Sequence, residues 1–251
     1  MENKYIFSLN NQSPQLLNDS NLSGRDVSIV KEEEDSRPPH CFFTSVHLNS
    51  LTNPIEIWAR GLSLIALYNG AGNLNYNPNS IFAPYDYKPT GLYIWDGDIN
   101  ITPSEYYNIT GSNPFDNNLP IENSLHYPSP NNKLDKVVRL SRSEKTVFNL
   151  LLQLSNDLNW TSLYAIVDSI KTYSKQQGKN FFMKVLMTAG YTENNLKAFT
   201  GTANNFGLLG TDARHGDLQF GRHQNTMLLK EAQTLVLALC NSYLSLAFAI
   251  I

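Results

Sequence analysis

Pro128-Ser129-Pro130-Asn131-Asn132 marks the point at which the sequence changes character. All 12 prolines of the 251-residue chain lie before residue 131. Proline removes a backbone donor and blocks helix interiors, so its absence from the rest of the chain permits long helices there. We therefore predict an α+β protein with a mixed region at 1–130 and a helical region at 131–251. The alternative that both regions pack as one domain stays open.

The region 1–130 combines β-branched and aromatic runs with one strong helix pattern. The runs predicted as strands are 27–30, 41–46 and 91–95. A turn at Asp96-Gly97 follows the last of them. Asn53 can cap a long helix, Pro54 suits its first position, and Glu56 completes a capping-box arrangement. Gly70-Ala71-Gly72 is expected to end or loosen this helix.

The region 131–251 shows apolar residues at helical spacing in four or five segments. Polar residues that can cap four of these helices are Ser141 with Glu144, Thr161, Thr192 and Thr226. Residues 181–186 indicate a further short helix. A glycine-punctuated loop at 205–225 is the longest polar interruption in this half, and loops between rigid helices commonly carry function.

Net charge is unevenly distributed along the sequence. The whole chain carries −3, with a pI near 5.9, and therefore has no overall attraction to nucleic acid. Residues 1–130 hold six Lys/Arg against fourteen Asp/Glu, whereas residues 131–251 hold thirteen against eight. This asymmetry indicates either an anionic partner for the second half or attraction between the two halves, and the second interpretation is the simpler one.

The sequence gives three indications of where the protein resides. Cys41 and Cys240 follow no metal or redox spacing, so free buried thiols are expected. The N-terminus lacks a basic region followed by an apolar run, which favours a cytoplasmic protein. The largely apolar stretch 235–251 is interrupted by polar residues, and no basic residue follows it. It is predicted to be a buried core helix rather than a membrane anchor, and it is also a candidate surface for homo-oligomers.

The loop 205–225 gathers charged and imidazole side chains. They are Asp212, Arg214, His215, Asp217, Arg222 and His223. Histidine titrates near neutral pH, and arginine has a permanent charge with planar donors. His215 could exchange protons with a phosphodiester while Arg214 or Arg222 stabilises charge on its oxygens. The simpler interpretation is structural, with Asp212 paired to Arg214 and His215 capping the preceding segment.

Metal and cofactor sites are not supported by the same loop. Asp212, His215, Asp217 and His223 are competent ligands, but their spacing is no recurrent zinc pattern and no thiolate accompanies them. The loop glycines follow a predicted helix instead of a strand, and no Gly-Lys-Ser/Thr or Gly-x-Ser-x-Gly motif occurs. We predict no metal and no cofactor.

A second candidate for binding is a basic residue at every third position. The series is Lys133, Lys136, Arg139, Arg142 and Lys145. On a helix such a series slants slowly around the axis as a positive stripe. Arg139 and Arg142, at its centre, are candidates for contacting RNA or an acidic protein surface. The alternative is a solvated surface that faces the acidic first half.

Short motifs in the second half resemble known proteins. Thr202-Ala203-Asn204, Ala213-Arg214-His215-Gly216 and Glu231-Ala232 form a pattern that resembles a widespread group of uncharacterised bacterial proteins with a helical C-terminal half. A looser likeness is to HEPN domains, which are helical modules of RNases in toxin and phage-defence systems. HEPN domains place an arginine several residues before a histidine, whereas here each arginine directly precedes its histidine, at 214–215 and 222–223.

Three functions follow as hypotheses. The first is a cytoplasmic bacterial binding or accessory module that engages an anionic ligand, RNA or a protein partner through its basic helical half. The second, which the likeness to HEPN domains implies, is a metal-independent RNase that uses Arg214 and His215. The third is an oligomerising structural protein. The sequence does not decide whether the protein is an enzyme.

Overall fold

A computed structural model describes most of the chain. The described residues are 4–10, 24, 26–32, 40–94, 97–101, 112–119, 133–214 and 225–250. They form two compact units, each built from two segments of the chain: unit 1 takes residues 1–71 and 86–151, and unit 2 takes residues 72–85 and 152–251. This division differs from a boundary at residue 130, because residues 133–151 group with the β-containing segments.

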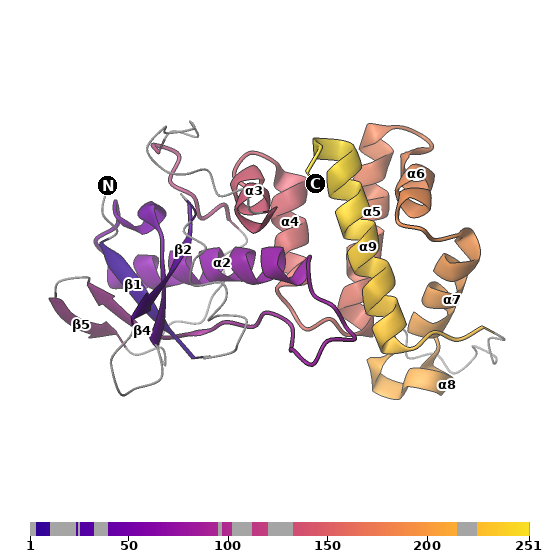
Figure 1. The fold of residues 1–251 in the computed structure, drawn as a ribbon, viewed down its shortest axis with the longest axis horizontal. Helices are drawn as coiled ribbons and strands as arrows, with labels where there is room; N and C mark the ends of the chain where they lie inside the picture. The colour runs from indigo at the N-terminus through magenta and orange to yellow at the C-terminus, as the bar shows by residue number, and fades with distance from the viewer. Residues whose placement is uncertain are drawn as a thin grey trace. The chain divides into compact units, whose positions relative to one another are not determined.

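Unit 1 contains an antiparallel sheet whose strand order is β2-β3-β1-β4-β5 (Figure 1). The strands are β1 (Tyr5–Leu9), β2 (Ser28–Glu32), β3 (His40–Thr44), β4 (Pro89–Ile94) and β5 (Gly97–Ile101). The predicted α+β class is confirmed, and the three predicted strands correspond to β2, β3 and β4. The expected turn at Asp96-Gly97 adjoins the pairing of β4 with β5, although Asp96 itself lies outside the described residues.

The central strand β1 was not predicted, and it carries much of the packing in unit 1. Its burial pattern shows almost no alternation, because side chains on both of its faces are covered. Phe7 is fully buried, and its ring centroid lies 5.5 Å from that of Trp58 in helix α2 (Pro54–Asn73). A Cβ atom at Gly61 would overlap the Phe7 ring, so glycine permits the close approach of α2 to the strand.

Helix α2 begins where the sequence predicts. The Asn53 side-chain oxygen accepts a hydrogen bond from the Ile55 N–H at 2.9 Å, and Pro54 occupies the first helical position. The glycines at 70 and 72 do not end the helix, which continues to Asn73. A Cβ atom at Gly70 would overlap the Leu151 carbonyl, so this glycine serves a close helix approach within unit 1 instead of a helix stop.

Two helices of unit 1 come from the basic segment. They are α3 (Lys133–Leu140) and α4 (Lys145–Leu154). Ser141 is not the cap that the Ser141–Glu144 spacing predicts. Its hydroxyl instead donates to the Val138 carbonyl at 2.6 Å. Ser141 therefore ends α3, and a short turn leads into α4.

Unit 2 is helical. Its helices are α5 (Trp160–Gln177), α6 (Phe181–Thr188), α7 (Glu193–Ala203), α8 (Phe206–Leu209) and α9 (Leu229–Phe248). Helices α5 and α9 lie side by side, and α6 and α7 pack against α5 (Figure 1). The apolar side chains of α9 are buried mainly from Ala232 to Leu244, as predicted for a core helix. Among the residues that the structure describes, no helix is long and apolar enough to cross a membrane.

The starts of these helices follow the predicted caps only in part. Thr192 caps α7 through a reciprocal capping box with Asn195, as expected. Helix α5 is capped by Asn159, whose side-chain oxygen accepts from the Ser162 N–H at 3.0 Å, and not by Thr161. Helix α9 begins at Leu229 and not directly after Thr226.

The segment 72–85 joins unit 2 through side-chain amides. Asn73 donates through Nδ2 to the Leu154 carbonyl at 2.9 Å. Asn241, near the end of the chain, donates through Nδ2 to the Leu74 carbonyl at 2.8 Å. This stretch is thus fixed to Leu154 and to α9 within unit 2.

Both cysteines are free and buried, as predicted. Burial raises the pKa of the Cys41 thiol, and it raises the pKa of Cys240 to about 12. Burial therefore disfavours the thiolate form of both groups, which is the form that acts as a nucleophile or a soft metal ligand.

Candidate functional site

The predicted loop site is described only in part. Asp212 and Arg214 belong to the described residues, and Asp212 is exposed at the end of a 3₁₀ turn (Gly210–Asp212). The other four candidates, His215, Asp217, Arg222 and His223, lie outside the described residues. Their suggested roles in proton transfer and phosphate binding stay predictions.

Arg214 is held in place by its backbone and by an aromatic ring. Its N–H donates to the Ala203 carbonyl at 2.9 Å, which ties the turn to the end of α7. The central carbon of its guanidinium lies 4.0 Å from the ring centroid of Tyr164 in α5. This distance places the cation on the negative face of the ring, where attraction is strongest.

The acidic partner of Arg214 is Asp168 of α5 and not Asp212. The Arg214 Nη2 atom lies 3.8 Å from Asp168 Oδ2, which is too long for a hydrogen bond. The two side chains are 38% and 46% exposed, respectively. No hydrogen bond joins the guanidinium to any residue that the structure describes, and the side chain is partly exposed to solvent.

The ring beneath Arg214 is the outer member of an aromatic series. Tyr164 stacks on Phe199 of α7, and Phe199 stacks on Trp160, with centroids 6.2 Å apart in each pair. Phe199 is fully buried and Trp160 nearly so. The guanidinium therefore lies on a platform whose base belongs to the core of unit 2.

Helices α5 to α7 also contain exposed or half-exposed lysines. They are Lys171 and Lys175 of α5, Lys184 of α6 and Lys197 of α7. The same three helices contain two acidic residues, Asp168 and Glu193. Helices α5 to α7 thus have a positive balance in addition to Arg214.

A second charged cluster, in unit 1, was not predicted from any motif. Asp26 Oδ1 accepts hydrogen bonds from His47 Nε2 at 2.8 Å and from Arg142 Nη1 at 2.9 Å. The side chains of Asp26, His47 and Arg142 are 1%, 0% and 5% exposed. We call these three residues the buried cluster.

Further contacts fix each member of the buried cluster. His47 Nδ1 accepts from the Asp116 N–H at 3.0 Å, so Nε2 carries the proton that it donates to Asp26. Arg142 Nη2 donates to the Leu119 carbonyl at 2.9 Å. Burial acts to raise the pKa of Asp26, but the hydrogen bond from His47 and the charge of Arg142 outweigh it and hold that pKa below its usual value.

The buried cluster connects segments and does not form a reactive centre. A hydrogen-bonded histidine and aspartate are the groups that a nucleophile would need as its base. Here both imidazole nitrogens have partners inside unit 1, and the ring has no exposed surface. The arrangement therefore joins residues that are 116 positions apart in sequence.

One sequence signal did point toward this cluster. The charge distribution indicated attraction between the acidic first half and the basic series 133–145, and the Asp26–Arg142 pair is an interaction of this kind. Arg139 also has an acidic partner, because its Nη2 lies 3.0 Å from Asp135 Oδ2 on the same helix. Arg142 is therefore paired inside unit 1 and is not exposed to an external ligand.

No metal site among the described residues and no known relative indicates a function for this protein. Within the described residues, no three His, Cys, Asp or Glu side chains are grouped so that they could hold a metal ion. Comparison of the chain with protein-family models, curated proteins and solved structures finds no match. We therefore infer a function from the geometry around Arg214.

Proposed function

We propose that the protein is a binding module that holds single-stranded RNA at Arg214 in unit 2. The observation that carries the proposal is the guanidinium of Arg214, positioned over Tyr164 with its N–H donors exposed and unbonded to described residues. Guanidinium groups bind phosphate through paired donors, and their flat faces stack with bases. An arginine supported from below by an aromatic ring offers both modes at one place.

The surroundings favour RNA over an acidic protein surface. Proteins that bind single strands combine a positive surface along the backbone with planar groups on which bases stack. The platform of Tyr164, Phe199 and Trp160 supplies the planar support, and the lysines of α5 to α7 supply the charge. Asp168 is half-exposed and lies too far away to satisfy the guanidinium, so a phosphate can compete with it.

The test is the affinity of the full chain for a labelled oligouridine, measured by fluorescence anisotropy. We expect Arg214→Ala to weaken binding about tenfold, because a charge-assisted hydrogen bond contributes about 1.5 to 3 kcal/mol. Arg214→Lys keeps the charge but loses the planar group, so its affinity should be intermediate. The affinity of the wild-type protein should fall linearly with the logarithm of salt concentration.

Lys230→Ala is the matched control, because Lys230 is an exposed cation of the same unit at the start of α9. It should reduce affinity far less than Arg214→Ala. Absence of RNA binding, or an equal effect of the two substitutions, would refute the proposal. Binding of an acidic peptide but not of RNA would assign the surface to a protein partner.

A related candidate is RNA cleavage at the same site, favoured by the position of His215 directly after the exposed Arg214. In that case His215→Ala should abolish cleavage while leaving RNA affinity and thermal stability unchanged. A metal chelator should have no effect on cleavage. If wild-type protein binds the oligonucleotide and leaves it intact, the binding module alone is supported.

A further inference from the structure

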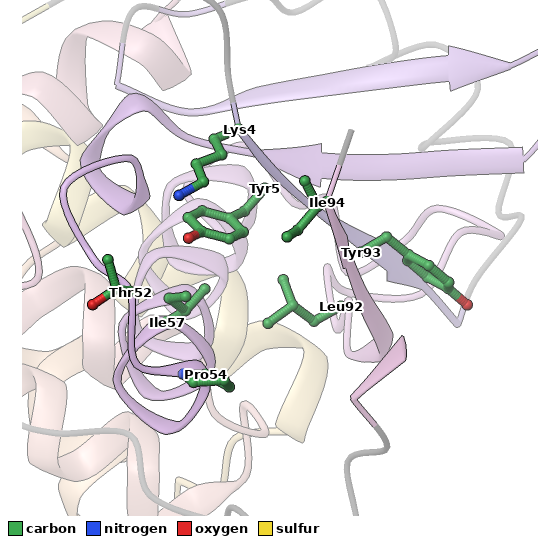
Figure 2. A pocket seen from close by; sticks show the side chains of 8 residues that line it. All are labelled: Lys4, Tyr5, Thr52, Pro54, Ile57, Leu92, Tyr93 and Ile94. Carbon is green, nitrogen blue, oxygen red and sulfur yellow. The ribbon is translucent and has the colours of Figure 1, made fainter. Parts of the chain in front are cut away.

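Unit 1 contains a pocket of about 200 Å³ between the sheet and the start of α2 (Figure 2). Its walls come from β1, β4 and the residues at 52–57. A volume of this size corresponds to about seven water molecules. It is smaller than the sites of drug-sized ligands, and it suits a molecule with a single ring or a short branched chain.

The lining divides into a polar side and an apolar side. Figure 2 shows the Lys4 ammonium and the Thr52 hydroxyl on one side, with the side chains of Leu92 and Ile94 opposite them. Ile57 of α2 forms the apolar floor, and both Ile57 and Leu92 are buried. The Tyr93 ring points away from the space, so the wall opposite Lys4 consists of aliphatic groups, whereas the Tyr5 ring lines the pocket beside Lys4.

The polar side is fixed by contacts of its own. The backbone N–H of Lys4 donates to Asn49 Oδ1 at 2.8 Å, and the Tyr5 hydroxyl donates to the Leu51 carbonyl at 2.9 Å. The Lys4 ammonium lies 4.9 Å from the centroid of the Tyr5 ring. Lys4 is the one charged side chain among the described residues that line the pocket, and it has no ion pair with any of them.

The electrostatic character of the pocket is therefore positive at one side. Lys4 contributes a full charge. Pro54, the first residue of the 20-residue helix α2, also lines the space, which places the positive end of the helix dipole beside it. A ligand that satisfies both sides has one negative group and a compact apolar body.

We propose that this pocket binds a small carboxylate with a compact apolar body, of the size of benzoate. The carboxylate accepts from the Lys4 ammonium and the Thr52 hydroxyl, and the body displaces water from Ile57, Leu92 and Ile94. This inference is independent of RNA binding, because it concerns unit 1 and none of the residues around Arg214.

The experiment is a titration of the full chain with benzoate, followed by NMR of methyl groups. We expect saturable shifts for the methyl groups of Ile57, Leu92 and Ile94. Benzyl alcohol, which has nearly the same shape but no charge, should bind more weakly. Lys4→Met should weaken benzoate binding about three- to tenfold, since an exposed cation contributes less than a buried one. The same substitution should leave the affinity for benzyl alcohol unchanged.

Two further variants test whether benzoate binds in this pocket. Lys88→Met removes another exposed lysine of unit 1 that does not line the pocket, and it should leave benzoate affinity unchanged. Ile94→Phe fills the space from the partly exposed end of β4, and it should abolish binding of both ligands. Shifts that do not saturate, equal affinity for benzoate and benzyl alcohol, or equal effects of the two lysine variants would overturn the inference.

Discussion

Each unit contains an arginine beside an aspartate, and the two pairs differ in almost every physical respect. In unit 1, Arg142 Nη1 lies 2.9 Å from Asp26 Oδ1, and both side chains have almost no exposed surface. Arg214 and Asp168 of unit 2 are 3.8 Å apart, and both are more than one third exposed. The first pair is shielded from solvent by fixed partners, whereas the second is exposed to solvent. The same residue types therefore form a tight internal connection in one place and an exposed, loosely associated pair in the other.

The largest expected effect comes from removing the cation of the buried pair. Arg142→Met leaves Asp26 ionised, buried and bonded to His47 alone, while its Oδ2 atom already lacks a hydrogen bond to any described residue. We expect unit 1 to lose about 3 to 5 kcal/mol of stability, as is typical when one partner of a buried pair is removed. Hydrogen exchange of the β1 and β3 amides measures this loss within unit 1.

Arg214→Met provides the comparison for that experiment. An equal loss of protection in unit 2 upon this second substitution would mean that burial does not distinguish the two pairs. A loss below about 1 kcal/mol for Arg142→Met would lead to the same conclusion.

A smaller effect is expected from pH at the buried pair. The pKa of Asp26 is lower in the folded protein than the value of about 3.9 in an unfolded chain. A lowered pKa contributes stability that is complete above the unfolded value and is lost as the pH falls through the folded value. Asp26→Asn should therefore destabilise unit 1 most above about pH 5.

The measurement is the unfolding of wild-type protein and Asp26→Asn by urea at a series of pH values. The difference between their free energies of unfolding should shrink as the pH decreases toward about 2. Parallel stability curves over this range would show that the Asp26 charge contributes nothing specific.

The smallest expected effect is on the stability of unit 2. Arg214→Ala and Asp168→Asn should each change its free energy of unfolding by less than about 1 kcal/mol, because exposed pairs contribute little. Asp168→Asn should nevertheless tighten RNA binding about twofold, since it removes a negative charge beside the guanidinium. A large loss of stability with either variant would place this pair in the same class as the buried one.

Local signals in the sequence predicted local structure well. Asn53 and Pro54 start α2, and Thr192 starts α7, because caps act through neighbouring backbone groups. Two nearby polar residues could cap α5, and the prediction of Thr161 was wrong, because Asn159 caps this helix. The prediction of a cap at Ser141 was also wrong, since a serine hydroxyl can instead donate to the carbonyl of a preceding residue.

Features that depend on distant contacts could not be predicted in the same way. Strand β1 is covered on both faces, so Tyr5–Leu9 lacks the alternation by which a half-buried strand is recognised. The buried cluster unites Asp26, His47 and Arg142, which share no motif. Arg214 was singled out by residue type, and its role stays a prediction; its partner Asp168 comes from another helix, which sequence spacing does not reveal.

The interleaved origin of unit 2 has a consequence for the order in which the protein is made. Residues 72–85 leave the ribosome early, but their partners follow much later: Leu74 waits for Asn241, which is 167 residues further along. Until residue 241 has been made, this stretch lacks its partner on α9 and is more open to proteases or chaperones. A premature stop before residue 241 therefore harms a segment that is encoded 167 codons earlier.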